Sequence, residues 1–263
     1  MSAAVRRSTD RTTKRATDRA ARLPARLTAV TAAELAKLRT LPAAVATALA
    51  TVLAGAVIAA ALAVYAADRG TPVSPVAAVV QAIPYVQAGL VLVGIWPVAH
   101  EYAGVQIRTT LVAVPDRGLL LAGKTAAALV AVALTAAATV GAGLAAAATA
   151  TAGEPSWTGT DPRTALGAAA YLTLLGLLSH AVALLLRHLV PALVGMLSLV
   201  LIASPLLGGL TGHARWLPDR AGALLYDPAA DTVLTGATGT LVLLGWIALI
   251  GAAAATRFAR SDP

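Results

Sequence analysis

One stretch of this 263-residue chain has the spacing of a phosphate-binding loop. Residues 118–125, GLLLAGKT, match the pattern G-x-x-x-x-G-K-[ST]. In nucleotide-binding proteins this loop follows a strand and precedes a soluble helix, and a separate acidic residue holds Mg²⁺. Here three leucines fill the loop, Pro115 precedes it without a strand, and an apolar run follows. We therefore predict no nucleotide site, and expect Lys124 at the membrane surface with its ammonium near lipid phosphates.

Other catalytic arrangements are not apparent in the sequence. It offers no Ser/His/Asp constellation, no paired carboxylates at helical spacing and no His-x-x-Glu ligand set. The chain has no cysteine and only four histidines, which excludes thiolate ligands and makes a metal centre improbable. We therefore predict no catalytic residue, no metal site and no cofactor held by this chain, and we do not expect it to be an enzyme.

The composition is that of a membrane protein. Hydrophobic residues make up 58% of the chain and charged residues 12%, and the mean hydropathy is +0.78. Six apolar runs are each long enough to cross a hydrocarbon core of about 30 Å as a helix, and lipid requires helices because backbone groups must be satisfied internally. We predict an all-α integral membrane protein with spans at residues 43–67, 76–99, 125–150, 164–186, 189–212 and 236–256.

Positive charge is concentrated near the N-terminus. Residues 1–42 contain ten of the twenty lysines and arginines, with three acids. Six spans put both termini on one side, and that side receives sixteen of the twenty basic residues, which predicts that both termini are cytoplasmic. A basic segment beside a bilayer typically contacts anionic lipid, so we expect membrane lipid and not nucleic acid as its partner.

The predicted domain organisation follows from these runs. Residues 1–26 have few large apolar side chains and are expected to be a disordered basic cytoplasmic tail. Residues 27–42 are expected to form an interfacial amphipathic helix, residues 43–256 the six-helix transmembrane domain, and residues 257–263 a second cytoplasmic tail.

The predicted interfacial helix carries an acid on its apolar stripe. At 100° per residue, Leu27, Val30, Leu35 and Leu38 share one face, and Glu34 lies among them. A carboxylate there is costly without a partner. Two interpretations remain open: Glu34 reaches lipid headgroup amines or water, or it forms an ion pair with a basic residue of the segment 100–124.

The third and fourth predicted spans differ in the size of their side chains. The third run consists mostly of Ala, Thr and Gly, and Gly141 and Gly143 would allow close helix packing. We therefore expect this helix inside the bundle, and the leucine-rich fourth helix, 164–186, more exposed to lipid.

Few polar groups are expected at mid-membrane. Gln81, Tyr85 and Gln87 either line a substrate pathway or form hydrogen bonds between helices. His180 is the one titratable candidate for a proton relay, although a lone histidine there is more often a packing residue. No Asp, Glu, Lys or Arg falls inside any predicted span, so an ion-coupled mechanism is not favoured.

Two polar segments separate the apolar runs. Residues 100–124 are predicted to be a cytoplasmic loop with two short helices flanking the turn at Pro115. Residues 213–235 mix Trp, Leu and Tyr with charged residues, which predicts either short re-entrant or interfacial helices or a surface loop anchored by Trp216 and Tyr226.

Three stretches carry a resemblance to a known family. The runs EYAGVQIRTTLVAVPDRGLLLAGK, AELAKLRT and ARWLPDRAG are similar to the cytoplasmic loop, the opening helix and an external segment of type-2 ABC exporter permeases. The resemblance implies the transmembrane subunit of an ATP-driven exporter in the bacterial inner membrane. It further implies a second permease subunit, either another copy in a homodimer or a relative of this chain, and two ATP-binding subunits, which would hold the ATP and Mg²⁺.

Site residues are expected on the cytoplasmic side. We expect the partner ATPase to act on the start of the 100–124 segment, and the opening helix to contribute Glu34, Lys37 and Arg39. Glu101 is expected to form a structural ion pair with Arg108 or Lys124. The alternatives are a non-transporting immunity or assembly factor and, less favoured, an ion-coupled secondary transporter. The predicted coupling residues are Glu101, Tyr102, Gln106, Arg108, Thr109 and Thr110.

Overall fold

The computed structural model describes residues 23–71, 73–103, 116–150 and 161–260. Within these residues the chain is helical, without a strand, and six of the helices are long and apolar enough to cross a membrane. The predicted all-α architecture with six candidate spans is therefore confirmed.

The helix boundaries lie close to the predicted spans, with an additional helix over residues 23–40 that we call the N-terminal helix. The other elements, in chain order, are α2 (Pro42–Asp68), α3 (Pro75–Ala103), α5 (Arg117–Ala150), α6 (Asp161–Leu186), α7 (Leu189–Ser198), the π-helical turn η1 (Leu199–Ala203), α8 (Ser204–Leu210), the 3-10 helix η2 (Gly212–Trp216), α9 (Pro218–Ala223) and α10 (Gly236–Arg260).

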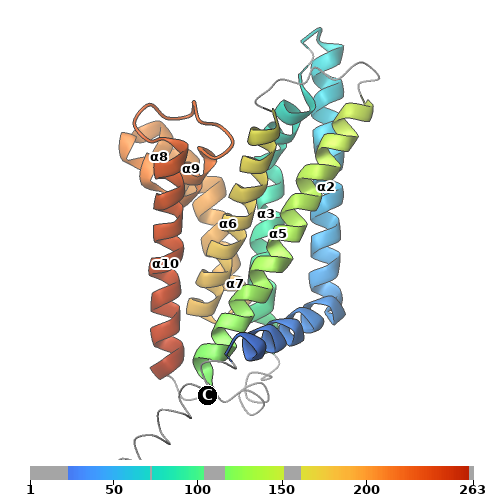
Figure 1. Cartoon of the computed structure of the whole chain (residues 1–263). Helices are drawn as coiled ribbons and strands as arrows, with labels where there is room; N and C mark the ends of the chain where they lie inside the picture. The colour runs from blue at the N-terminus through green and yellow to red at the C-terminus, as the bar shows by residue number, and fades with distance from the viewer. Residues whose placement is uncertain (1–22, 72, 104–115, 151–160, 261–263) are drawn as a thin grey trace, which may run out of the picture.

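The long helices run roughly side by side, and α3 and α6 lie at the centre (Figure 1). Helices α2, α3 and α5 pack against one another on one side of the bundle, and α10 packs mainly against α6 and α9 on the other. The N-terminal helix crosses the end of the bundle drawn at the bottom of Figure 1, which we call the lower end. Helices α8 and α9 lie at the opposite, upper end.

The N-terminal helix has the amphipathic pattern that the sequence predicts. Leu27, Val30, Leu35 and Leu38 are partly covered, whereas residues between them, such as Ala36, are exposed. Residues 23–26, the last four of the predicted tail, are helical, and residues 1–22 lie outside the described residues. Pro42 starts α2 at its first turn, which separates the two helices.

The predicted loop of residues 100–124 is shorter in the structure. Helix α3 continues to Ala103, and α5 begins at Arg117, eight residues before the predicted third span. The carboxylate of Asp116 accepts a hydrogen bond from the backbone N–H of Leu119 at 3.1 Å, so Asp116 caps α5. The helix expected after Pro115 is thus the first part of α5, and the one expected before Pro115 falls outside the described residues.

The expectation that the fourth span is the more lipid-exposed one is wrong. Over an apolar stretch of 18 residues, 56% of the residues of α6 are buried, against 44% in the corresponding stretch of α5. Helix α6 contacts α3, α5 and α10. A Cβ at Gly94 of α3 would overlap the backbone of Gly176 in α6, and a Cβ at Gly176 would overlap the side chain of Val132 in α5. Small residues at these contacts therefore let a leucine-rich helix occupy the centre.

The two glycines singled out in the third span behave differently. A Cβ at Gly143 would lie 3.0 Å from Val79 Cγ2 and 3.5 Å from the Cβ of Ala59, so this glycine does permit close packing against α2 and α3. Gly141 faces open space. The prediction is confirmed for Gly143 and wrong for Gly141.

Short helices occupy the segment before the last span. Helices η2 and α9 lie at the upper end, and α9 packs against α6 and α10. The indole N–H of Trp246 in α10 donates to the carbonyl of Trp216 at 3.0 Å, which fixes the end of η2. Helix α10 then continues to Arg260, so the predicted tail of residues 257–263 begins as helix.

Candidate functional site

Four charged side chains form a cluster at the lower end. The ammonium of Lys124 lies 2.5 Å from a carboxylate oxygen of Glu34 and 2.9 Å from one of Glu101. The ammonium of Lys37 lies 2.6 Å from Glu34 and 3.0 Å from Glu101. Acids and bases alternate, so every close neighbour is of opposite charge. We call these four residues the lower junction.

Three elements contribute to the lower junction. The N-terminal helix supplies Glu34 from its apolar stripe and Lys37 one turn later, α3 supplies Glu101 near its end, and α5 supplies Lys124 two turns after its start. Close approach of the N-terminal helix to α5 depends on Gly123, because a Cβ there would overlap the side chain of Val30. The sequence thus places a glycine beside the buried lysine.

Three of the four side chains are buried. Glu34, Glu101 and Lys124 are 5%, 3% and 4% exposed. Burial alone would raise the pKa of Glu34, but Lys124 and Lys37 together hold that pKa below its ordinary value of 4.5. Burial also opposes the charge of Lys37, but its hydrogen bonds to Glu34 and Glu101 raise its pKa above 10.5. Both shifts favour the charged forms of Glu34 and Lys37, and the formal charges of two acids and two bases sum to zero.

The junction joins the ends of α3 and α5, the helices on either side of the intervening segment. Lys124 also donates to the carbonyl of Pro97 in α3 at 3.3 Å. One oxygen of Glu101, Oε2, is buried and has no hydrogen-bond partner among the described residues. Since a buried ion pair is costly to break from one side, the ends of α3, α5 and the N-terminal helix are expected to move together.

The sequence predictions for these residues have mixed outcomes. Of the two interpretations of Glu34, the ion pair with the 100–124 segment is confirmed, and Lys124 is the partner. The expected pairing of Glu101 with Lys124 is also confirmed, whereas Arg108 lies outside the described residues. The expectation that Lys124 contacts lipid phosphates is wrong, because its ammonium is buried between Glu34 and Glu101. Because α5 starts at Arg117, this lysine lies inside a helix that is long and apolar enough to cross a membrane.

The remaining predicted residues at this end are not in the junction. Arg39 is exposed and borders an apolar groove between the N-terminal helix, α2, α3 and α5. Tyr102 lies in the last turn of α3. The predicted coupling residues Gln106, Arg108, Thr109 and Thr110 fall outside the described residues.

The structure separates the three candidate pathway residues. Gln87 is buried and its side-chain oxygen accepts a hydrogen bond from the hydroxyl of Tyr171 in α6 at 3.0 Å. Gln81 and Tyr85 are exposed on another face of α3. For Gln87 the hydrogen bond between helices is therefore confirmed, and the three residues do not form one polar path.

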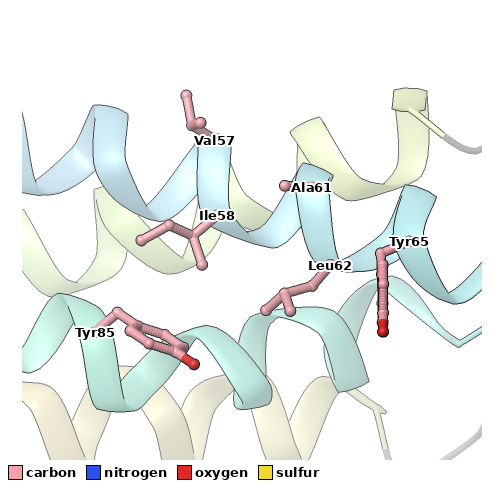
Figure 2. A pocket seen from close by; sticks show the side chains of 6 residues that line it. All are labelled: Val57, Ile58, Ala61, Leu62, Tyr65 and Tyr85. Carbon is pink, nitrogen blue, oxygen red and sulfur yellow. The ribbon is translucent and has the colours of Figure 1, made fainter.

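Tyr85 instead lines an apolar groove between α2 and α3. Figure 2 shows its ring opposite Ile58 and Leu62 of α2, with Tyr65 farther along the same helix. The groove has a volume of about 510 Å³ and its other lining residues are aliphatic. No charged side chain lines it, so the groove is suited to a hydrocarbon chain and not to an ion.

His180 is buried in the centre of the bundle. Its Nδ1 lies 3.3 Å from the carbonyl oxygen of Gly94, and its Nε2 has no partner among the described residues. This contact agrees with a packing role between α3 and α6. Among the described residues, no group of three His, Cys, Asp or Glu side chains is arranged to hold a metal ion.

Sequence reasoning missed two features. Lys37 bonds Glu101 as well as Glu34, and the available signal was the three-residue spacing of Glu34 and Lys37 on one helix. The second is a polar pocket at the upper end that contains Arg215, Arg220 and Asp231. The sequence spacing of these three residues matches neither a helix face nor a known motif. It therefore gives no indication that their side chains meet.

The fold and the site define the class of the protein. It is a multi-pass α-helical membrane protein with six candidate spans and a buried charged junction at the lower end. Comparison of the chain with protein-family models and with curated proteins finds no match.

Proposed function

We propose that this protein is the transmembrane subunit of an ATP-driven exporter of the type-2 ABC permease kind, powered by separate ATP-binding subunits. The observation that carries the proposal is the lower junction. It ties the N-terminal helix to the ends of α3 and α5, the two helices that flank the segment resembling the permease coupling loop.

The mechanism follows from that connection. A partner ATPase that presses on the segment between α3 and α5 would displace both helix ends. Because Lys124 bonds Glu34 and Glu101 at once, the N-terminal helix would move with them. Helix α3 packs on α6, whereas α5 packs on α2, so the displacement would reach both halves of the bundle. Tight packing transmits such shifts because well-packed interiors deform little.

The described part of the chain offers little with which to power transport itself. Its buried charges within the candidate spans belong to the lower junction, where they are paired, and His180 bonds a backbone carbonyl. Proton or sodium coupling usually employs acidic groups near mid-membrane. An external energy source is therefore favoured over ion coupling.

Purification from native membranes tests the proposal. We expect the tagged full chain, solubilised in mild detergent, to bring with it a stoichiometric ATP-hydrolysing subunit. Recovery of the chain alone under conditions that preserve other ABC complexes would instead favour the non-transporting membrane factor.

The coupling role of Glu101 is tested in the recovered complex. Glu101→Gln keeps the shape of the side chain and removes its charge, so we expect transport-stimulated ATP hydrolysis to fall while the complex stays intact. Arg39→Gln is the matched control, because it removes an exposed charge of the N-terminal helix outside the junction. Unchanged stimulation in Glu101→Gln would remove the junction from the mechanism.

A further inference from the structure

The upper end contains a polar pocket that the proposed function does not use. It has a volume of about 250 Å³ and lies where α8, η2 and α9 meet. We call it the upper pocket. Its lining includes Gly208, Arg215, Arg220 and Asp231.

The two arginines of the upper pocket differ in their partners. A guanidinium nitrogen of Arg215 lies 3.3 Å from a carboxylate oxygen of Asp231. The same oxygen of Asp231 accepts the backbone N–H groups of Val233 and Leu234, at 2.6 and 3.0 Å, and these bonds hold the pKa of Asp231 below its ordinary value. The carboxylate of Asp231 is therefore held in place by the backbone and is already paired with Arg215.

Arg220 contacts the backbone of α8. Its guanidinium lies over the backbone of Gly208, and it donates to the carbonyl of Ser204 across 3.4 Å. No carboxylate of the described residues lies within ion-pair distance of Arg220, although its charge acts on Asp219, which is buried outside the pocket lining. Burial raises the pKa of Asp219, and the charge of Arg220 acts against this rise. The pocket lining therefore holds two arginines and one carboxylate, and Arg220 presents an exposed, planar cation suited to phosphate oxygens.

Exposed apolar residues lie along the spanning helix that ends at the pocket. Leu206, Leu207 and Leu210 of α8 are 61%, 39% and 73% exposed, and Leu201 and Ile202 precede them on the same spanning helix. None of these five residues lines the pocket itself. Trp216 follows the lining residue Arg215 in sequence and is 51% exposed. A cation at the end of a helix with exposed apolar residues, near an indole, matches a molecule with an anionic head and hydrocarbon tails.

We propose that the upper pocket binds the phosphate group of an anionic phospholipid, with the acyl chains along α7 and α8. Arg220 contacts the phosphate, and Arg215 with Asp231 forms the polar side of the pocket. Free inorganic phosphate shares the head-group chemistry but makes no use of the exposed leucines. The inference is independent of the proposed transport function, since it concerns the opposite end of the bundle.

The test uses the full chain in vesicles of phosphatidylcholine that contain a minor fraction of brominated phosphatidylglycerol. Quenching of Trp216 is the signal, obtained as the difference between the chain and its Trp216→Phe variant. We expect phosphatidylglycerol to be preferred over brominated phosphatidylcholine, and Arg220→Gln to lower this preference about fivefold, as expected for one cationic contact near a membrane surface. Arg220→Lys keeps the charge and should retain most of the preference.

A matched control comes from the same end of the bundle. Arg69 follows α2, is exposed, and lies 4.6 Å from the ring centre of Tyr65, away from the upper pocket. Arg69→Gln should leave the preference unchanged. Equal quenching by the two lipids, or an equal loss in Arg69→Gln and Arg220→Gln, would overturn the proposal. Displacement of the lipid by millimolar inorganic phosphate would also overturn it, in favour of a free-phosphate site.

Discussion

The lower junction and the upper pocket use the same kinds of charged groups for different purposes. In the lower junction two acids and two bases alternate, and three of the four are buried. In the upper pocket Asp231 bonds Arg215, and the exposed Arg220 lies outside that pair. Buried, balanced charge ties helices together, because removing one partner leaves the others uncompensated. Exposed, unbalanced charge leaves capacity for a ligand.

The largest expected effect separates the two lysines of the lower junction. Lys124→Met removes a buried ammonium and leaves Glu34 and Glu101 with only the half-exposed Lys37, so we expect a loss of about 3–5 kcal/mol in the free energy of unfolding. Lys37→Met should cost at most about 1 kcal/mol, since a pair that water reaches contributes little. Unfolding in detergent micelles measures both variants, and equal losses would contradict the burial of the junction.

A smaller effect is expected from the glycine beside Lys124. Gly123→Val would force the N-terminal helix away from α5 at Val30, and we expect a cost of about 1–3 kcal/mol. Gly141→Val lies on the same helix in open space and should be close to neutral. Thermal unfolding of both variants is the measurement. An unchanged unfolding temperature in Gly123→Val would mean that the N-terminal helix does not pack closely against α5.

The hydrogen bond between α3 and α6 should contribute less. Tyr171→Phe removes the donor to the buried oxygen of Gln87, so we expect a loss of about 1 kcal/mol. Tyr85→Phe is the matched control, because Tyr85 is 63% exposed and its hydroxyl has no partner among the described residues. Similar stability changes in the two variants would argue against a structural role for the buried bond.

The pH dependence of stability should have opposite signs at the two ends. The pKa of Glu34 is lowered by its lysines, so its contribution is present above the ordinary value of 4.5 and is lost as the pH falls through the lower folded value. Burial raises the pKa of Asp219 above 3.8, so its ionisation destabilises the fold as the pH rises through that range. Lowering the pH should therefore remove the stabilising charge of Glu34 at the lower end and the destabilising charge of Asp219 at the upper end.

Two variants measure these contributions separately. The difference in unfolding temperature between the chain and Glu34→Gln should shrink as the pH falls below 4.5. For Asp219→Asn, the unfolding temperature of the variant should rise relative to that of the unaltered chain as the pH increases from 3.8. Parallel curves for the two variants would contradict the proposed difference between the ends.

The sequence predicts the fold of this protein better than its sites. Uninterrupted apolar runs determine the six spans, because lipid permits few alternatives to helices. The position of Glu34 on an apolar stripe also indicates a buried partner, and Lys124 fulfils that expectation. The start of α5 is missed because GLLLAGK alternates apolar, small and charged residues in a way that suits a loop or a helix.

Contacts between distant segments explain the other differences. Whether α5 or α6 is central depends on where small residues meet at helix contacts, as at Gly94 of α3 and Gly176 of α6, and no single helix carries that information. The upper pocket depends on how η2 and α9 fold back over α8, which brings Arg220 onto Gly208. Short helices of this kind have too few turns for periodicity to reveal their exposed faces.

The most direct test of the central claim is a pair of spin-label distances in the complex with its ATP-hydrolysing partner, with and without ATP and vanadate. The chain has no cysteine, so introduced cysteines carry the spin labels specifically. One double variant, Ala33→Cys with Leu129→Cys, labels the N-terminal helix and α5. The other, Ala33→Cys with Thr256→Cys, labels the N-terminal helix and α10. We predict that trapping ATP changes the Ala33–Thr256 distance and leaves the Ala33–Leu129 distance unchanged, because the lower junction moves as one unit. A change between Ala33 and Leu129, or no change in either pair, would contradict coupling through the junction.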